Sequence, residues 1–316
     1  MKKVLQQMGV LAAVGSAFAS GSFAQELAKE ILTTFAPGTI RVEYARPAKL
    51  RTLTEYAALR QRYVGPRLRA LEESFALLGV GENDIDEVVL GWRPGVATME
   101  LAGLVAGRFT AKGIADRAGA NAIASTTVGS LPAFCLSTGG VNSCLVVLRD
   151  SLGLFGSEAA LNEMLAVREG NTPGLSADQR LTRLISEAET QAPIWGVGVA
   201  EAVPDFFLAW LPAQGNIQLD WAKAFQPVEA LVYSVDTAET VRLDVKLECT
   251  SDQSAESTRQ IFEGLRMVQQ MAWQNMNPGK PNPFQSLEIA RDGARLSLKM
   301  ATSYADLKAF SPAGGL

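Results

Sequence analysis

The sequence contains no histidine. Histidine is the side chain whose ordinary pKa suits proton transfer near neutral pH, so its absence removes the usual general base of hydrolases. A Ser-His-Asp or Cys-His catalytic apparatus therefore cannot be assembled within one chain. Imidazole metal sites are excluded for the same reason, and three cysteines cannot supply a four-ligand zinc site. We expect no catalytic residue, no metal site and no cofactor.

Cysteine is scarce, and two of the three residues lie close together in the sequence. Cys135 and Cys144 flank a turn-rich stretch between two apolar segments, and a disulfide across that hairpin is predicted. On the loop-entropy model, closing a loop of about ten residues stabilises the fold by roughly 2.5–3 kcal/mol. Cys249 lies in an alternating strand pattern, which is more typical of a buried free thiol than of a nucleophile.

Long hydrophobic runs are also missing, because no segment beyond the N-terminal region reaches 18 uninterrupted apolar residues. We therefore expect no transmembrane helix after signal cleavage. The N-terminal region itself has Lys2 and Lys3, a mainly apolar run over residues 10–19, and small-x-small cleavage sites ending at Ala19 and Ala24. This pattern is that of a secretory signal peptide, here residues 1–24, and it predicts a periplasmic or secreted protein.

Positive charge is in slight deficit, with a formal net charge of −4 that becomes −6 once Lys2 and Lys3 are removed. This sign disfavours nucleic acid as a partner. One stretch is nevertheless basic, and it is either a solvated helix face or a patch for an envelope protein, an anionic lipid or a polysaccharide. Its residues are Arg41, Arg46, Lys49, Arg51, Arg60, Arg62, Arg67 and Arg69.

The hydrophobic periodicity indicates a chain of mixed helices and strands with a sizeable core, since 47% of its residues are hydrophobic. Gly65-Pro66 should split the helix predicted at residues 52–78. Helices are predicted at residues 26–32, 52–78, 110–117, 157–167, 176–190, 254–276 and 304–310. Strands are predicted at residues 88–92, 101–109, 122–128, 133–136, 144–149, 152–155, 194–200, 231–235, 241–249, 287–290 and 294–300.

Two stretches of the chain look alike. Residues 145–150 (LVVLRD) resemble residues 287–292 (LEIARD), and both precede a strand and a short helix. Each half then reads as strand–strand–helix–strand–strand–helix, although coincidence between two hairpins is the alternative. We predict an α+β fold of antiparallel sheets with helices on one face. The expected units are residues 25–190 and 191–310, followed by a flexible tail at residues 311–316.

Few residues point to chemistry. Asp205, Asp236 and Glu239 could in principle supply a carboxylate pair for glycoside cleavage, but no motif singles out two of them. Gly196-Val197-Gly198 lacks the third glycine and the helix of a dinucleotide site, so it more plausibly relieves close packing in a strand. Between two prolines lies an apolar segment that either covers a core or forms a docking patch, with Phe206, Phe207, Trp210 and Leu211 as its large side chains.

Two short motifs carry a family resemblance. Gly107-Arg108-Phe109 ends an early hairpin, and Leu154-Phe155-Gly156 precedes a helix. Over roughly residues 37–310 the chain resembles an uncharacterised family of exported bacterial proteins. The resemblance implies a duplicated α+β architecture and supplies no catalytic residues. The sequence thus favours an exported, non-catalytic binding or scaffold protein. A carboxylate-based envelope hydrolase and a peripheral membrane-surface protein using the basic stretch are the alternatives.

Overall fold

A computed structural model of the chain describes residues 23–64, 66–95, 99–199, 202–210, 220–276, 278–279 and 282–309. Nearly all of the predicted signal peptide, and the predicted tail at residues 311–316, lie outside these ranges. No helix in the described ranges has the length and apolar character needed to span a membrane.

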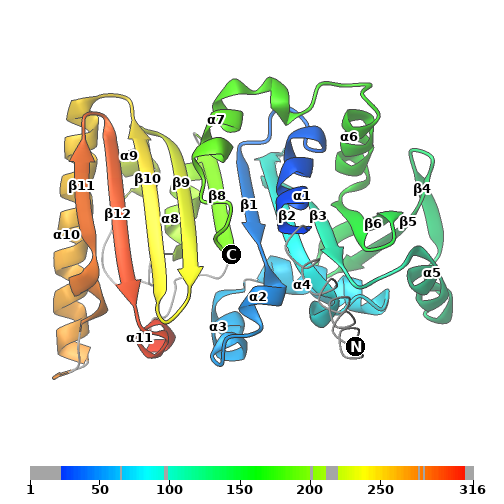
Figure 1. The fold of residues 1–316 in the computed structure, drawn as a ribbon, viewed down its shortest axis with the longest axis horizontal. Coiled ribbons are helices and arrows are strands. Elements are labelled where there is room, and N and C mark those ends of the chain that lie inside the picture. The colour runs from blue at the N-terminus through cyan, green and yellow to red at the C-terminus, as the bar shows by residue number, and fades with distance from the viewer. Residues whose placement is uncertain are drawn as a thin grey trace, which may run out of the picture.

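The described strands form one antiparallel sheet of 12 strands, in the order β11-β12-β10-β9-β8-β1-β2-β3-β7-β6-β5-β4 (Figure 1). The pairing of β1 with β8 joins its two halves. The strands are β1 (Arg41–Ala45), β2 (Ile85–Pro94), β3 (Met99–Gly107), β4 (Ser125–Val128), β5 (Leu131–Thr138), β6 (Val141–Arg149), β7 (Leu152–Gly156), β8 (Ile194–Val199), β9 (Val228–Thr237), β10 (Val241–Cys249), β11 (Glu288–Asp292) and β12 (Arg295–Thr302).

Most helices lie between these strands in the chain, and the described residues also form four short 3-10 turns. The helices are α1 (Phe23–Glu30), α2 (Pro47–Leu50), α3 (Tyr56–Tyr63), α4 (Pro66–Leu77), α5 (Ala111–Ala120), α6 (Glu158–Arg168), α7 (Gln179–Glu187), α8 (Ala202–Trp210), α9 (Trp221–Phe225), α10 (Asp252–Met276) and α11 (Tyr304–Ala309). The 3-10 turns are η1 (Ile31–Thr33), η2 (Glu82–Asp84), η3 (Leu175–Ala177) and η4 (Pro283–Ser286).

The same strand order occurs twice, running outward from the junction of β1 and β8. On one side the order is β1-β2-β3-β7-β6, and on the other it is β8-β9-β10-β12-β11. In both halves a hairpin, a helix (α5 or α10) and a later hairpin follow in the chain, and the second strand of the later hairpin pairs with the earlier one. The N-terminal half has two additional strands, β4 and β5, before its later hairpin. This repetition supports the duplicated α+β unit that the sequence predicts. The division of the chain near residue 190 stays a prediction.

Side chains alternate between the two faces of the sheet, as successive strand residues must. One face is covered in the N-terminal half, where Val42, Tyr44 and Trp195 pack in a core with Leu27 of α1 and Leu161 of α6. Helix α1 lies in front of β2 in this view (Figure 1). The opposite face carries two further cores, one under α4 and α5 and one under α8, α9 and α10.

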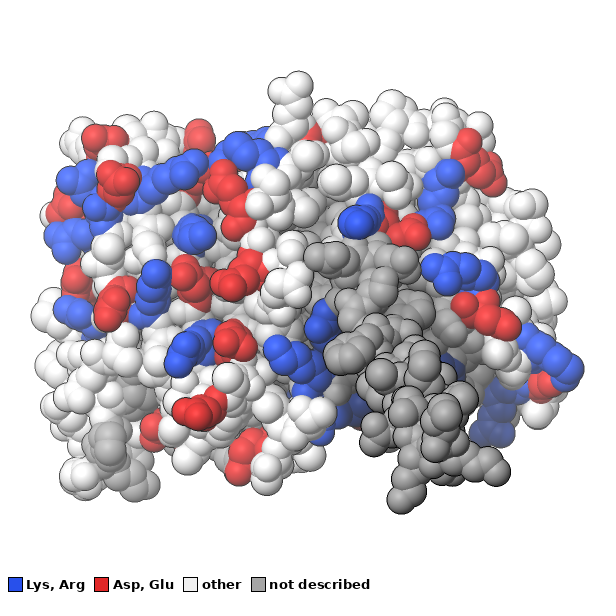
Figure 2. Space-filling model, viewed as in Figure 1, with Lys and Arg blue, Asp and Glu red and all other residues white. Residues whose placement is uncertain are grey.

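In the C-terminal half, α7 covers this first face over β8 and part of β9, and the face is left to solvent over β10 to β12. Figure 2 shows Lys and Arg interspersed with Asp and Glu over the region where Figure 1 places β9 to β12. Arg242 and Lys246 are exposed on β10, while Val241, Val245 and Leu247 are buried on its other side. The predicted half-exposed strand at residues 241–249 is therefore confirmed.

Local signals explain most of the element boundaries. Ser157 caps α6 by accepting a hydrogen bond from the Ala160 amide at 3.2 Å, as the sequence predicts. The helix predicted to start at Ser176 differs, because Asp178 caps α7 and residues 175–177 form a 3-10 turn. Residues 41–45 are a strand that was not among the predicted elements, and β1 is central to the sheet.

The predicted disulfide is present. Cys135 on β5 and Cys144 on β6 are directly paired residues of the hairpin, and their sulfur atoms are bonded. Cys249 is a buried free thiol whose pKa is raised by burial, as its strand pattern indicated.

Candidate ligand cavity

A large apolar cavity lies across the junction of the two halves. Its volume is about 480 Å³, within the usual range of small-molecule sites. The sheet contributes Glu43, Val88, Leu90, Val105, Phe155, Ile194, Tyr233, Val235, Leu243, Val245, Leu298 and Met300, and the helices contribute Leu50, Tyr56, Leu59, Arg60, Leu68, Phe75, Phe206, Phe207, Phe262, Leu265, Tyr304 and Leu307.

Helices from both halves of the chain close the cavity. Helix α3 from the N-terminal half contacts α11 from the C-terminal half. Leu59 on α3 and Leu307 on α11 both line the cavity. Because the two halves share one cavity, its shape depends on how α3 and α11 pack together.

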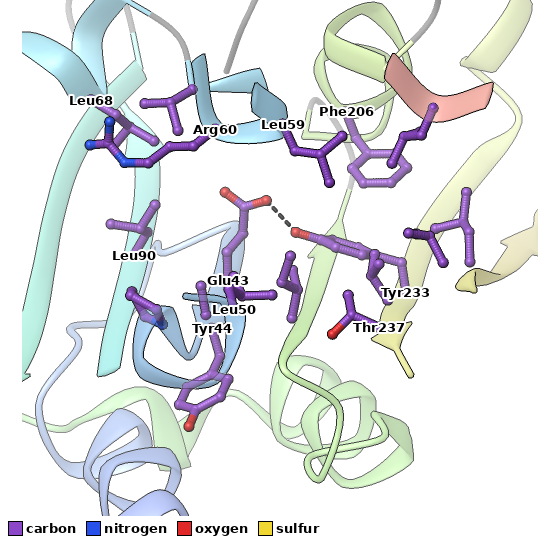
Figure 3. A pocket seen from close by; sticks show the side chains of 18 of the residues that line it. Glu43, Tyr44, Leu50, Leu59, Arg60, Leu68, Leu90, Phe206, Tyr233 and Thr237 are labelled. Atoms are coloured by element: carbon purple, nitrogen blue, oxygen red, sulfur yellow. Dashed lines mark hydrogen bonds between the residues drawn. The ribbon is translucent and has the colours of Figure 1, made fainter. Parts of the chain in front are cut away.

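One polar group stands out in the apolar lining. The Glu43 carboxylate on β1 accepts hydrogen bonds from three side chains, and Figure 3 shows it pointing toward the Tyr233 hydroxyl. The Arg41 guanidinium donates from Nη2 to Oε1 at 2.6 Å, and the Trp92 indole donates to Oε2 at 3.0 Å. Tyr233 donates its hydroxyl hydrogen to Oε1. The buried charge is thus both paired and hydrogen-bonded, which is what a carboxylate in an apolar site requires.

Arg41 balances this charge without lying on the surface. Its side chain is only 7% exposed, and its guanidinium lies 5.6 Å from the ring centre of Trp92 and 5.8 Å from that of Phe206. Burial by itself would lower the pKa of Arg41, but the Glu43 carboxylate holds that pKa above its ordinary value. Burial, reinforced by Glu43, raises the pKa of Tyr233, so its hydroxyl stays protonated as a donor.

A glycine makes room for this network. Gly196 on β8 lies opposite both Glu43 and Tyr233 in the sheet. A Cβ atom on Gly196 would lie 2.5 Å from Cε1 and 2.8 Å from the hydroxyl oxygen of Tyr233. The tyrosine ring can therefore lie across the strand toward Glu43 only because this position has no side chain. This close packing is the role that the sequence suggested for Gly196.

The residues of the predicted basic patch are divided between the two faces of the sheet. Arg41 is buried beside the cavity. Arg46 lies on the other side of β1, where its Nε contacts the Tyr44 hydroxyl at 3.2 Å and the Glu87 carboxylate at 3.9 Å. Lys49 is exposed. A patch containing all eight residues on one surface is therefore not formed.

Among the arginines of the α2–α4 region, Arg60 lines the cavity and the others make contacts around it. Arg51 donates to the backbone oxygens of residues 82 and 85, both at 2.8 Å. Arg60 pairs with Glu72, and both line the cavity. Arg67 donates to the backbone oxygen of Met99 and lies 5.3 Å from the Trp92 ring centre. Arg69 donates to the backbone oxygens of Val64 and Gln61. The side chain of Arg62 lies outside the described part of the structure.

The apolar segment predicted as a possible docking patch is in fact part of a core. Phe206 and Phe207 are 2% and 5% exposed, because α8 packs them against Phe225, Phe262 and Tyr233. The exposed-patch interpretation is wrong for these two residues, since aromatic partners cover them. The side chain of Trp210 and all of Leu211 lie outside the described residues.

The acidic residues do not form an obvious catalytic pair. Asp205 and Glu239 are exposed, and neither they nor Asp236 line the cavity. The cavity is lined by Glu43, Glu72 and Glu82, which contact Arg41, Arg60 and the Tyr56 hydroxyl respectively. Within the described ranges, no three Cys, Asp or Glu side chains are grouped so that they could hold a metal ion.

Glu43 and Tyr233 are among the polar residues of the cavity that the sequence did not single out. The available signal was the alternation of Val42 and Tyr44 with charged residues over residues 41–45, which is the pattern of a strand. Arg41 and the basic residues that follow led instead to the interpretation of this segment as part of a charged stretch.

The fold is similar to that of the protein TP0453. Its crystal form III matches with a TM-score of 0.54 and 12% sequence identity, covering 88% of this chain and 96% of TP0453. Crystal form I matches with a TM-score of 0.53 and 11% identity, covering 88% and 95%. No family model and no curated protein sequence matches the chain. At this identity the likeness shows an α+β fold of the same kind and nothing of the ligand.

Proposed function

We propose that this protein is exported and binds, without chemically changing it, a ligand with a long apolar body. The observation that carries the proposal is the apolar cavity of about 480 Å³ between the two halves. Contiguous apolar surface in a cavity of this size is typical of a binding site, because water gains little by filling it. Glu43 and Tyr233 form a hydrogen-bonded polar centre on the sheet side of the site.

Export is supported by two independent features. The N-terminal 24 residues have the order of a signal peptide. The disulfide between Cys135 and Cys144 suits a protein that works in an oxidising compartment such as the periplasm or the cell exterior. The lack of histidine and the pairing of every carboxylate in the cavity favour binding over hydrolysis.

The proposal is tested by blocking the cavity. Leu243 lines the cavity from β10 and is only partly buried, so the larger ring of Leu243→Trp should enter the cavity rather than the core. We expect this variant to bind the neutral apolar dye Nile red at least tenfold more weakly than the unmodified protein. Leu77→Trp is the matched control, because Leu77 lies on α4 with 45% of its surface exposed. Equal dye binding by all three proteins, with unchanged thermal unfolding, would refute the cavity as the site.

A further inference from the structure

A second pocket adjoins the apolar cavity at α3. It has a volume of about 540 Å³ and is lined by Arg51, Tyr56, Ala57, Arg60, Gln61, Arg69, Glu82 and Asn83. Three of these residues, Tyr56, Arg60 and Glu82, also line the apolar cavity. The two spaces therefore meet at the same side chains, with an apolar space on one side and a polar space on the other.

The charges in this second pocket are unequal. Three arginines and one glutamate line it. Arg51 and Arg60 also contact Asp86 and Glu72, which are not part of the lining. Arg69 differs from both, because in the described part of the chain it donates hydrogen bonds to the backbone oxygens of Val64 and Gln61, which do not neutralise its charge.

Arginine is well suited to hold an anionic group at such a place. Its planar guanidinium offers five N–H donors and binds carboxylate or phosphate through two parallel hydrogen bonds. The aliphatic part of the side chain can pack on apolar surface while the charged end stays in a polar space. Arg60 is placed for both tasks, since Figure 3 shows its side chain beside Leu68 in the cavity and its residue also lines the polar pocket.

The end of the cavity at Glu43 is a poorer place for an anionic group. Glu43 already carries a negative charge there. The neighbouring donors, Arg41, Trp92 and Tyr233, already donate their hydrogen bonds to the Glu43 carboxylate. A second carboxylate or phosphate at that end would be buried beside a like charge. The direction of the ligand is thereby fixed by the two ends of the site.

From these contacts we infer that the ligand is an anionic amphiphile. This inference rests on the proposed function. The apolar chain occupies the cavity, and the carboxylate or phosphate lies in the pocket of Arg51, Arg60 and Arg69.

The test compares ligands that differ only at the head. Palmitate, hexadecyl phosphate and hexadecanol are titrated as competitors of bound Nile red, with sodium acetate and inorganic phosphate as anions that lack a chain. We expect palmitate and hexadecyl phosphate to compete about tenfold better than hexadecanol, and the chain-free anions not to displace the dye. Raising the salt concentration should reduce this preference, because exposed charges are screened.

The variant Arg69→Gln should reduce the preference for palmitate over hexadecanol to less than threefold and leave hexadecanol binding unchanged. Arg242→Gln is the control, because Arg242 is exposed on β10 on the opposite face of the sheet. Equal competition by palmitate and hexadecanol, with no effect of Arg69→Gln, would overturn the anionic headgroup and leave the proposed function standing. Unchanged dye binding by Leu243→Trp would instead overturn the proposed function itself.

Discussion

Replacing Gly196 by alanine should be costly although it adds a single methyl group. The new Cβ would lie 2.5 Å from Cε1 and 2.7 Å from Cζ of Tyr233. Ordinary carbon–carbon contacts are about 3.5–4 Å, so the ring would have to move by roughly 1 Å. The ring has little room to move, because Tyr233 is only 2% exposed and its ring centre lies 4.6 Å from that of Phe206.

Three effects set the size of the change. Overpacking costs about 1–3 kcal/mol, and weakening the hydrogen bond to the Glu43 carboxylate costs about 1.5–3 kcal/mol. Alanine in place of glycine restores about 0.4–1 kcal/mol by restricting the unfolded chain. The free energy of unfolding should therefore fall by about 2–5 kcal/mol, which lowers Tm on the order of 5–15 °C for a chain of this size.

Guanidinium unfolding followed by tryptophan fluorescence measures the change, and a double-mutant cycle shows its cause. In the background Tyr233→Ala the ring is absent, so Gly196→Ala should cost at least about 1 kcal/mol less than in the unmodified protein. Gly264→Ala is the matched control, since no atom lies within 4 Å of the added Cβ, and this helical substitution should stabilise the fold by about 0.5–1 kcal/mol. An equal cost in both backgrounds would refute the contact with Tyr233 as the reason for this glycine.

Three further outcomes follow from other parts of the fold. Removing the disulfide with Cys135→Ala and Cys144→Ala should lower the free energy of unfolding, measured by urea unfolding, by about 2.5–3 kcal/mol. Chemical reduction of the unmodified protein should give the same urea unfolding curve as the double variant. Hydrogen bonds from Arg183, and then Arg295, lower the pKa of Glu248; the resulting stability is present above the unfolded pKa and is lost as pH falls through the folded pKa. Glu248→Gln should thus lower the free energy of unfolding by about 1 kcal/mol at pH 7 and leave it unchanged in acid. Burial raises the pKa of Glu87 instead, so Glu87→Gln should leave the fold at least as stable. Expressed in a bacterium with its own N-terminus, the exported protein should have the mass of a chain beginning at Gln25.

The sequence was sufficient for elements whose signals are local. Helix α10 was expected at residues 254–276 and is found at Asp252–Met276, because its apolar face recurs at helical spacing. The helix expected at residues 52–78 is split as Gly65-Pro66 predicted, into α3 and α4. The fold class follows from such elements, since hairpins and helices in alternation favour antiparallel sheets.

The binding site could not be predicted in the same way. Glu43 and Tyr233 are 190 residues apart in the sequence, and their meeting depends on the pairing of β1 with β8 and of β8 with β9. Arg41 and Glu43 read as members of a charged surface stretch, because an ion pair between residues two apart on one side of a strand leaves no mark in composition. Only the register of the sheet shows that both side chains turn inward.

The cavity has a physical origin in the junction of the two halves. Each half fills its own core with large apolar side chains, Phe75 and Phe155 on one side and Phe207 and Phe262 on the other. At the junction, β8 presents Gly196 and Gly198 to this face, and β1 presents Arg41 and Glu43 opposite them. The Tyr233 ring lies against Gly196 and Ala202 lies against Gly198, so both positions are covered. The cavity lies beyond them and is lined by side chains of both cores, including Phe75 and Phe262. Both halves therefore contribute to the wall of the cavity, and filling it with Leu243→Trp should weaken dye binding at least tenfold while both cores remain folded.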